Sequence, residues 1–562
     1  MLRRRVASAI SLSPLLHPVL RRIYAQRGIA SDAELALDLK HLVPPQALLG
    51  IDAAAELLHD ALVRRERIIV VGDYDADGAT GTALAVSALR AFGAAQVDYL
   101  VPSRFKQGYG LSAELADVAH AQGAQLLITV DNGISSVAGV ARAKALGLRV
   151  LITDHHLAGP QLPVADAMVN PNQPGCNFPS KCLAGVGVMF YVLSALRARL
   201  REAGWFKERA EPKLADFLDL VAVGTVADVV RLDQNNRILV ANGLARIRAR
   251  RARPGILALL QVAGRDLDRV SSTDLAFAIG PRLNAAGRLE DMRLGIDCLL
   301  CTDEAEALSM AQRLDAINRE RRDIEAQMRE DALSMTDKIE STAIGISLFD
   351  ARWHEGVVGL VASRIKDKLH RPVFAFARAH ESGMLKGSGR SIAGLHIRDV
   401  LALVDARHPG LITRFGGHAM AAGLTLPEAG LPAFSAAFEE ACRGMLDDSA
   451  LEKLLETDGE LLPGEFDLAT ARAIEDAGPW GQGFPEPLFE GCFELREVRR
   501  IGEKHARYRL NGPGLRSIEA IHFNVADGLP PPGPVQLAYR LCVNRWQGAE
   551  TAELRVEWLG AP

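Results

Sequence analysis

The chain has 562 residues, of which 48% are hydrophobic and 24% are charged, and its formal net charge is −4. This length predicts about three or four domains, and the composition is ordinary for a folded protein. No run of about 18 uncharged apolar residues occurs, which excludes a membrane-spanning helix. Seven cysteines are too few for a disulfide scaffold, so we expect a protein of the reducing cytoplasm.

The first 50 residues form an N-terminal segment, and an α/β domain is predicted over residues 51–302. Its first half alternates strand-like and helix-like runs. The strands are expected at 67–71, 96–101, 126–130 and 149–153, and the helices at 79–92, 112–122 and 136–146. This alternation is typical of βαβ units and predicts a doubly wound parallel sheet. Residues 171–300 are more helical in pattern and continue the same domain.

A long helix and a second α/β domain are predicted next. The polar stretch 303–340 repeats apolar residues at helical spacing, so we interpret it as a helix that connects two domains. The second α/β domain is expected over residues 341–447. Within it we expect strands near 343–349 and 372–377, and glycine-rich loops at 387–389 and 416–417.

The last hundred residues differ in character from the rest. Residues 455–562 alternate polar and apolar side chains between turns rich in Gly and Pro, which predicts a small antiparallel β-barrel. The word Gly478-Pro479-Trp480-Gly481-Gln482 suggests that this barrel docks against the second α/β domain.

Short acidic motifs follow three of the strand-like runs. They are Asp73-Tyr74-Asp75-Ala76-Asp77-Gly78, Asp131-Asn132-Gly133 and Asp154-His155-His156, and a fourth acid, Asp228, follows the apolar stretch 218–227. In open parallel sheets ligands bind outside the carboxyl ends of the strands, so these side chains should converge. Converging carboxylates repel one another unless cations neutralise them. The sequence therefore predicts a metal site, and with it a metal-dependent phosphoester hydrolase.

The residue types indicate which metal the site would hold. Carboxylate oxygens with one or two imidazoles suit Mn²⁺ or Mg²⁺ better than a thiol-rich zinc site does. Two such ions about 4 Å apart would hold a phosphate between them and generate hydroxide from water. In an extended segment, Asp73, Asp75 and Asp77 would alternate onto one face.

The four acidic motifs resemble, in the same order, those of the DHH phosphoesterase superfamily. Longer sequence motifs show a closer resemblance to the bacterial RecJ exonucleases. This resemblance extends from about residue 20 to the C-terminus. These motifs are Val71-Gly72-Asp73-Tyr74-Asp75-Ala76-Asp77-Gly78-Ala79-Thr80, Gly280-Pro281-Arg282-Leu283-Asn284-Ala285-Ala286-Gly287-Arg288, Trp353-His354-Glu355-Gly356-Val357-Val358-Gly359, Lys386-Gly387-Ser388-Gly389-Arg390-Ser391 and Phe415-Gly416-Gly417-His418-Ala419.

The resemblance implies both a fold and an activity. The fold is a DHH domain, a helical connector, a DHHA1 domain and a C-terminal OB-fold barrel. The activity is 5′-to-3′ hydrolysis of single-stranded DNA to 5′-mononucleotides, in DNA recombination and repair. Single-strand-binding protein and a helicase are implied as partners by that role alone, and a monomer is expected.

Metal ligands follow from the same resemblance. Asp75 and Asp131 would bind one ion, and the second would be held by Asp77, Asp131, His155 and Asp228, with Asp131 bridging. Asp154 would orient the histidines and His156 would touch the scissile phosphate. Asp73 lies on the same face two residues before Asp75, farther from the expected metal positions, and is a weaker ligand candidate. The resemblance leads us to expect a proline at position 231, where this chain has Arg231. This difference bears on the shape of the loop after Asp228 and not on the role of Asp228 as a metal ligand.

Candidate contacts to DNA lie in the later motifs. The segment Gly387–Ser391 offers backbone donors, hydroxyls and a guanidinium within five residues. Alone it would be a flexible turn, but the resemblance assigns Ser388 and Arg390 to the 5′ end of the DNA. The other candidates are Arg282 and Asn284 in the Gly-Pro-Arg-Leu-Asn word, Arg104, and His418 beside a pair of glycines.

Two other functions are compatible with parts of the pattern. A small-substrate hydrolase of the same superfamily, such as a pyrophosphatase, a cyclic-dinucleotide phosphodiesterase or an oligoribonuclease, would normally end after the second domain. A non-catalytic scaffold would typically have lost metal ligands, whereas this chain retains each one. The β-rich C-terminal region and the intact ligand set therefore favour the exonuclease. Metal preference, processivity and tolerance of RNA stay open.

Overall fold

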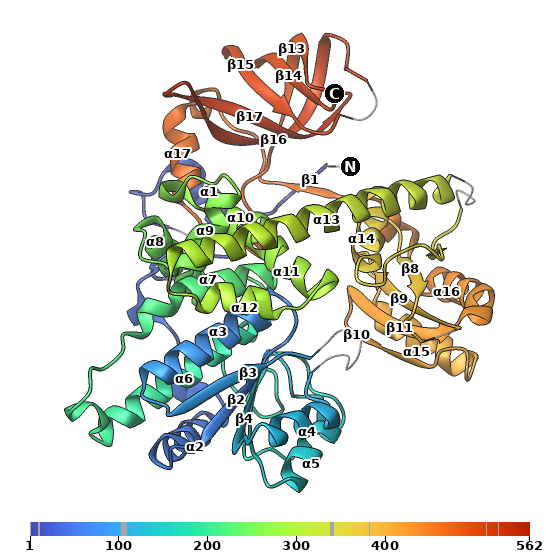
Figure 1. Cartoon of the computed structure of the whole chain (residues 1–562). Coiled ribbons are helices and arrows are strands. Elements are labelled where there is room, and N and C mark those ends of the chain that lie inside the picture. Colours follow the sequence, from blue (N-terminus) through green and yellow to red (C-terminus); the bar gives the residue numbers. More distant parts are fainter. Residues whose placement is uncertain are drawn as a thin grey trace.

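The chain folds into a large α/β domain, a smaller α/β domain and a β-barrel, and a long helix joins the first two (Figure 1). The structure is a computed structural model. It describes residues 2–8, 12–102, 110–337, 342–381, 383–512, 514–525 and 528–562. Among these residues, no helix has the length and hydropathy needed to span a bilayer.

The large domain is built on a parallel sheet of five strands in the order β3-β2-β4-β5-β6. The strands are β2 (Arg67–Val71), β3 (Gln96–Leu100), β4 (Leu126–Val130), β5 (Arg149–Thr153) and β6 (Ala167–Val169). The central strands are apolar along nearly their whole length because helices cover both faces. The doubly wound parallel sheet predicted from the sequence is therefore confirmed.

Successive residues of β2 face opposite layers of helices. Ile68 and Val70 belong to the main core with α2 (Ile51–Val63), α3 (Ala76–Ala91) and α6 (Gly185–Glu202). Ile69 and Val71 pack in a second core with α4 (Ala113–Ala121) and α5 (Val137–Ala145). This alternation follows from the two-residue period of a strand, and it fixes the carboxyl ends of the strands at one edge.

Helices extend the main core beyond the sheet. They are α7 (Leu218–Ala227), α8 (Gln234–Arg248), α9 (Pro254–Val262), α10 (Ser272–Asp274), a π-helical segment (Leu275–Ile279), α11 (Gly280–Leu289) and α12 (Arg293–Leu300). The 33-residue helix α13 (Glu304–Thr336) then crosses to the second domain. Its N-terminus is capped by Asp303, whose carboxylate accepts from the Glu306 amide at 2.8 Å. The long connector predicted from the sequence is thus present.

The second domain has a mixed sheet in the order β10-β11-β9-β8-β7. Its strands are β7 (Ile346–Phe349), β8 (Val373–Arg378), β9 (Met384–Arg390), β10 (Arg414–Gly417) and β11 (Ala421–Pro427), and its helices are α14 (Val358–Leu369), α15 (Ile397–Arg407) and α16 (Leu431–Met445). The glycine-rich loops predicted at 387–389 and 416–417 are wrong, because both segments are strands.

Aromatic packing explains the glycines of β9. A Cβ on Gly387 would lie 2.4 Å from the Phe376 ring, and one on Gly389 would lie 2.4 Å from the Phe374 ring. Glycine at both positions therefore lets the strand approach the aromatic core. The backbone amides of this segment are engaged with β8 and β11, so they do not form the phosphate cradle that a free loop would offer.

The C-terminal strands close into a barrel in the order β13-β14-β15-β17-β16. They are β13 (Phe489–Ile501), β14 (His505–Gly512), β15 (Leu515–His522), β16 (Gly533–Trp546) and β17 (Ala549–Gly560), and α17 (Leu468–Asp476) packs on β16. The N-terminal strand β1 (Leu2–Arg4) pairs with β12 (Leu455–Thr457), so the N-terminus lies below the barrel that holds the C-terminus (Figure 1). The helix α1 (Pro18–Gln26) contacts α17.

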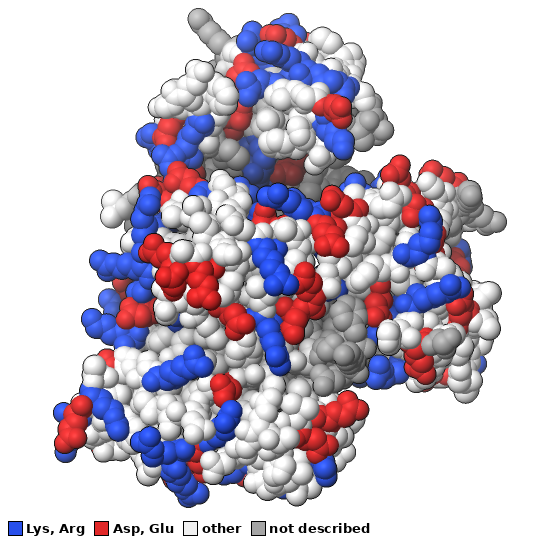
Figure 2. Space-filling view, viewed as in Figure 1, with Lys and Arg blue, Asp and Glu red and all other residues white. Residues whose placement is uncertain are grey.

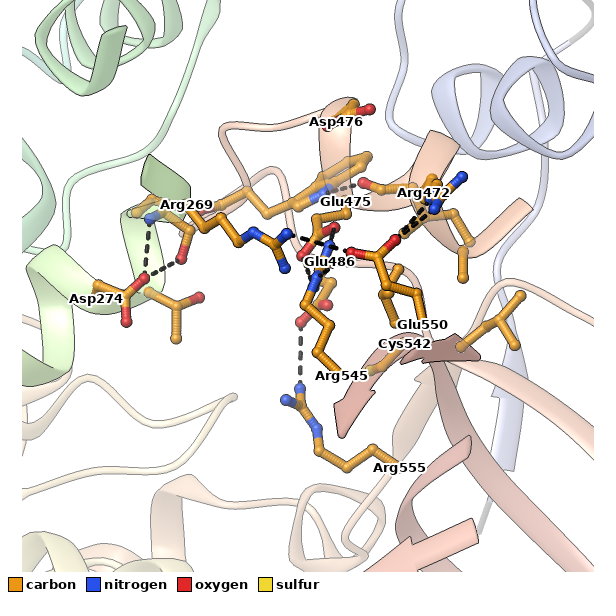
Figure 3. Close-up of a pocket in the computed structure, with 18 of the residues that line it drawn as sticks. Arg269, Asp274, Arg472, Glu475, Asp476, Glu486, Cys542, Arg545, Glu550 and Arg555 are labelled. Carbon is orange, nitrogen blue, oxygen red and sulfur yellow. Dashed lines mark hydrogen bonds and ion pairs between the residues drawn. The ribbon is translucent and has the colours of Figure 1, made fainter. Parts of the chain in front are cut away.

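Ion pairs join the barrel and α17 to the large domain around a cavity of about 560 Å³ (Figure 3). Glu550 of the barrel binds Arg269 of the large domain at 3.3 Å and Arg472 of α17 at 2.5 Å. Arg545 binds Glu475 of α17 at 2.5 Å. The barrel region therefore docks against the first domain, and the docking against the second domain suggested by the Gly478–Gln482 word is wrong.

Candidate metal centre

The first acidic motif spans the junction between β2 and α3. Asp73 lies two residues after the strand, Asp75 caps the helix by accepting from the Gly78 amide at 3.0 Å, and Asp77 lies inside the first turn. The expectation that the three acids alternate along an extended segment is therefore wrong for Asp77. Its carboxylate nevertheless turns toward the others, because helix and strand meet at the same edge of the sheet.

The second motif turns sharply at the end of β4. Asp131 has a φ of 63°, in the left-handed region that Asp tolerates better than most residues. The side-chain amide of Asn132 donates to the carbonyls of Val71 and Val130, at 3.0 and 2.9 Å, and so ties the ends of β2 and β4 together. A Cβ on Gly185 would lie 2.5 Å from the Asp131 Cβ, so a glycine lets α6 begin directly beside the acid.

The structure brings the acids and histidines into overlapping groups of possible ligands. Within each group the ligand atoms lie within 4.8 Å of one another, and the groups are Asp73, Asp75 and Asp131; Asp77, His155 and Asp228; and Asp131, His155 and His156. His155 Nε2 lies 3.0 Å from Asp131 Oδ1, 3.4 Å from Asp228 Oδ2 and 4.0 Å from Asp77 Oδ2. Asp73, the weaker candidate from the sequence, sits in a group with two stronger ones.

Asp154 holds the two histidines in place. Its Oδ1 accepts from His156 Nδ1 at 2.8 Å and from the His155 backbone amide at 2.7 Å, while Oδ2 accepts from the Ile134 amide at 2.9 Å. A carboxylate with so many donors is fixed in one orientation. Because Asp154 engages Nδ1 of His156, Nε2 is the ring nitrogen that Asp154 does not hold.

Burial and mutual repulsion shift the proton affinities of the acids. Burial, with the charge of Asp75, raises the pKa of Asp77 to about 7. Burial and the charge of Asp77 also raise the pKa of Asp131 and of Asp228 well above the ordinary carboxyl range. Such a group is stable in its charged form when a cation shares the site.

The two histidines are shifted in opposite directions. Burial lowers the pKa of His155 to about 4, so the imidazole is neutral at pH 7 and its nitrogen can bind a metal. Burial also disfavours charge on His156, but the hydrogen bond and charge of Asp154 outweigh this and raise its pKa. His155 therefore has the properties of a ligand, and His156 those of a group that faces an anion.

The donor set fits a divalent ion. His155 Nε2 and Asp228 Oδ2 are buried and have no hydrogen-bond partner among the described residues. Buried polar atoms normally find partners, so atoms that converge without one indicate a bound species. Carboxylate oxygens with one or two imidazoles match Mn²⁺ or Mg²⁺, and no thiol belongs to the candidate groups among the residues that the structure covers.

Backbone amides at the start of α6 are a part of the site that the sequence analysis missed. The Gly185 and Val186 amides donate to the Asp77 carboxylate at 2.6 and 2.9 Å. The N-terminus of a helix carries partial positive charge and free amides, so it can orient a buried carboxylate. The glycine at 185, the first residue of α6, is the feature of the sequence that could have revealed it.

A cleft of about 790 Å³ runs from His156 into the second domain. Its lining includes Ser388 on β9 and His418 at the turn after β10. The His418 ring is stacked on His156 at a centroid distance of 5.9 Å. Alternation along β9 places Lys386, Ser388 and Arg390 on one face, opposite the buried glycines. Two of the predicted DNA contacts, Ser388 and His418, therefore lie in one cleft with the metal centre.

The remaining predicted contacts are placed differently. Arg282 is buried, donates to the Ala278 carbonyl at 2.7 Å and pairs with Asp315 of α13 at 2.6 Å, so these donors serve the fold in this structure. Asn284 accepts from the Ala76 amide at 2.8 Å and so supports the start of α3. Arg390 donates to the Gly389 carbonyl at 2.8 Å. Arg104 lies outside the described residues.

The loop after Asp228 carries the arginine that departs from expectation. Asp228 is the C-cap of α7, and the next residue, Val229, has a left-handed φ of 60°. Arg231 follows, with its backbone carbonyl accepting from the Asn236 side chain at 2.9 Å. The Asp228 carboxylate still points to His155, so Arg231 does not displace this acid from the group.

Family models match each of the three domains. The DHH family N-terminal domain matches residues 67–225, the DHHA1 domain matches residues 341–444, and the RecJ OB domain matches residues 457–558. The parallel sheet with acids at its strand ends, the second domain across the cleft and these matches define a metal-dependent phosphoesterase of the DHH class.

Similarity to individual proteins is stronger still. The single-stranded-DNA-specific exonuclease RecJ of Escherichia coli is 51% identical over 99% of this chain and 98% of that protein. Thermus thermophilus RecJ in complex with Mn²⁺ superposes with a TM-score of 0.83 at 34% identity, covering 98% of this chain and 79% of that one. The complex of the Thermus protein with Mg²⁺ gives a TM-score of 0.77. The chain belongs to the RecJ family of single-stranded-DNA-specific exonucleases.

Proposed function

We propose that this protein removes 5′-mononucleotides from single-stranded DNA in the 5′-to-3′ direction, using two divalent ions. The observation that carries the proposal is the set of ligand groups that share Asp131 and His155, one of which includes His156 of the cleft lining. The RecJ relatives are named as exonucleases specific for single-stranded DNA, and the Thermus protein is crystallised with Mn²⁺ or Mg²⁺.

The ligands divide between two positions. Asp75 and Asp131, with Asp73 close by, would hold one ion. Asp77, His155 and Asp228 would hold the other, with Asp131 between the two positions. When bound, such a pair of ions clamps a phosphate and lowers the pKa of a water so that it can attack.

The remaining residues of the centre orient and stabilise charge. The Gly185 and Val186 amides and the Asp154 carboxylate fix Asp77 and His156 before the substrate arrives, which avoids reorganisation during the reaction. The raised pKa of His156 favours its protonated form, which can donate from Nε2 to a phosphate oxygen of the substrate. His156 is therefore proposed to contact the scissile phosphate.

The second domain would bind the 5′ end. Ser388 and His418 line the cleft, and Arg390 lies on the same face of β9 as Ser388. A terminal phosphate would accept from the Ser388 hydroxyl and the Arg390 guanidinium. A terminal binding site next to the metal centre makes cleavage start from an end. Arg104 is a further candidate, whereas Arg282 and Asn284 are proposed to act through the fold that supports the site.

The family also suggests a cellular role. The protein would act on single-stranded DNA in recombination and repair, as a monomeric, cytoplasmic enzyme. Its proposed partners are single-strand-binding protein and a helicase. This part of the proposal rests on the family alone.

The polarity is tested with one oligonucleotide labelled at either end. In Mn²⁺, a 5′ label should appear as a mononucleotide in the first turnover, and a 3′ label should pass through progressively shorter fragments. EDTA should abolish both patterns. Early release of a 3′-labelled mononucleotide, or internal fragments from a circular strand, would refute the proposed direction or the requirement for an end.

A further inference from the structure

The loop that follows Asp228 lies against the segment that leads into the barrel. We call residues 478–484 the barrel linker. The Leu232 amide donates to the Gln482 carbonyl at 2.7 Å. A Cβ added to Gly483 would lie 2.4 Å from Arg231 Cγ, and one added to Gly481 would lie 2.7 Å from Leu232 Cδ1. The linker thus touches the loop at backbone distance.

The barrel linker is itself held firmly by the large domain and by α1 of the N-terminal segment. The rings of Trp480 and Phe484 stack at 5.1 Å, and Tyr24 of α1 stacks on Phe484 at 6.2 Å. The Arg237 guanidinium lies 4.2 Å from the centre of the Phe484 ring. The Trp480 carbonyl accepts from the Ser272 hydroxyl at 2.5 Å. Contacts from three separate parts of the chain make the linker a fixed surface for the loop.

The loop needs such a surface because its conformation is unfavourable. Val229 is β-branched and has a φ of 60°, a combination that persists only where the surroundings hold it. Val229 directly follows Asp228 at the end of α7. A loop that relaxed toward ordinary dihedral angles would rotate the end of the helix, and the Asp228 carboxylate would turn away from His155.

We propose that Gly483 is a positioning residue for the metal centre. It has a left-handed φ of 71°, and its missing side chain lets the barrel linker close onto the stem of Arg231. The closed linker holds the loop, and the loop holds Asp228 at 3.4 Å from His155. Gly483 touches neither metal nor substrate. The inference rests on the proposed role of Asp228 as a metal ligand.

The test compares two alanine substitutions in the full-length protein. In Gly483→Ala the new Cβ meets the stem of Arg231, which is not a flexible end that can move aside. Gly264→Ala is the matched control, because Gly264 of the large domain also has a left-handed φ, of 65°, and no atom lies within 4 Å of the new Cβ. Mn²⁺ affinity is measured by the electron paramagnetic resonance signal of free Mn²⁺, without DNA.

We expect Gly483→Ala to bind Mn²⁺ about tenfold more weakly than the parent, as is usual when a group that supports a ligand is lost. Gly264→Ala should bind like the parent. The double variant Arg231→Ala/Gly483→Ala should recover most of the affinity, because the Cγ that clashes is gone. Excess Mn²⁺ should restore the turnover of Gly483→Ala, which a general loss of fold would not allow.

Equal Mn²⁺ affinity of folded Gly483→Ala and Gly264→Ala would overturn the inference while leaving the proposed function intact. A parent protein that binds no Mn²⁺ would overturn the proposed function itself. If Gly483→Ala does not fold, Gly481→Ala replaces it, since its Cβ meets only the flexible end of Leu232. We then expect a smaller loss of affinity, and parental affinity in that variant would overturn the inference.

Discussion

The imidazole rings of His156 and His418 lie 5.9 Å apart with an interplanar angle of 24°, although the residues belong to different domains. The catalytic cleft is therefore complete only when both domains are correctly placed. Ion pairs along α13 fix that placement, since Glu325 binds Arg321 at 2.6 Å and Arg364 of α14 at 2.8 Å. The pair between Glu325 and Arg364 ties the connector to the second domain, so the connector has a structural role beyond that of a spacer. Over the visible face of the molecule, basic and acidic side chains are interspersed (Figure 2).

Asp131→Asn should abolish hydrolysis while the fold is preserved. Asn keeps the size of the side chain and tolerates the left-handed φ of 63°. The loss of the shared carboxylate should lower turnover to below about one hundredth, because metal-site chemistry is worth several kcal/mol. Turnover on a labelled oligonucleotide and Mn²⁺ binding are the measurements. Asp166→Asn is the control and should retain activity, because Asp166 lies just before β6 and pairs with Lys144 of α5, outside the ligand groups. Parental turnover in Asp131→Asn would exclude the bridging role.

Arg390→Ala should weaken binding of DNA with a 5′ phosphate more than binding of DNA with a 5′ hydroxyl. A lost charge-assisted pair costs roughly 1.5–3 kcal/mol. Dissociation constants for the two oligonucleotides are compared in Ca²⁺, which should support binding with little cleavage. Arg378→Ala, an exposed arginine paired with Glu428 in the same sheet, should change neither constant. Equal losses for both ends would place Arg390 elsewhere along the strand.

Removal of metal should make the stability of the protein depend on pH. The pKa of Asp77 is raised to about 7 by burial, so the folded state binds more protons than the unfolded state does. Stability from this group is present at low pH and is lost as pH rises through about 7. The raised pKa values of Asp131 and Asp228 act in the same direction. The pKa of His155 is lowered to about 4, so His155 makes the folded protein more stable as pH rises. This opposing effect acts mainly below about pH 6.5, the ordinary pKa of histidine.

The measurement is urea unfolding in EDTA between pH 6.5 and 8, where the opposing contribution of His155 fades as its imidazole loses its proton in the unfolded state. The free energy of unfolding should fall over this range in the parent and should fall less in Asp77→Asn. Saturating Mn²⁺ should reverse the trend, because metal binding competes with protons. A metal-free protein that becomes more stable toward pH 8 would show that these acids are already neutralised by other groups.

Much of the fold and the positions of the acids could be predicted from local patterns. Runs such as 126–130, in which only Thr129 is polar, predict buried parallel strands, and acids follow these runs closely. The error at Asp77 has a physical reason: Asp75 is also a good helix cap, and the cap starts α3 before the third acid. Residues 73–77 are compatible both with an extended segment and with the first turn of a helix, and the sequence alone does not decide between these two structures.

Long-range contacts account for the other differences. Nothing local reveals that Gly387 and Gly389 face the rings of Phe376 and Phe374, which is why a strand looked like a loop. Likewise, the sequence around Arg282 gives no sign of its ion-pair partner, because Asp315 lies 33 positions later, on α13. Without that partner, Arg282 is predicted to bind phosphate. The signals that could have helped are weak: alternation of glycine with polar residues in β9, and an acid on the connector.

Truncation should separate the barrel from the barrel linker. A protein that ends at residue 488 keeps Trp480 and Phe484 and loses only the strands from Phe489 onward. It should retain the Mn²⁺ affinity of the parent and cleave short oligonucleotides at a near-parental rate. Its KM on long single strands should rise and its salt dependence should flatten, because the barrel would extend the binding track and add phosphate contacts.

A protein that ends at residue 450 also loses the barrel linker. It exposes the large-domain residues that pack on Trp480 and Phe484, so its melting temperature should be lower, and the loop after Asp228 loses its support. We therefore expect weaker Mn²⁺ binding from the shorter protein than from the longer one. Equal metal affinity in the two would argue that the linker stabilises the fold without positioning Asp228. If the protein that ends at residue 488 has the parental KM on long single strands, the barrel does not take part in DNA capture.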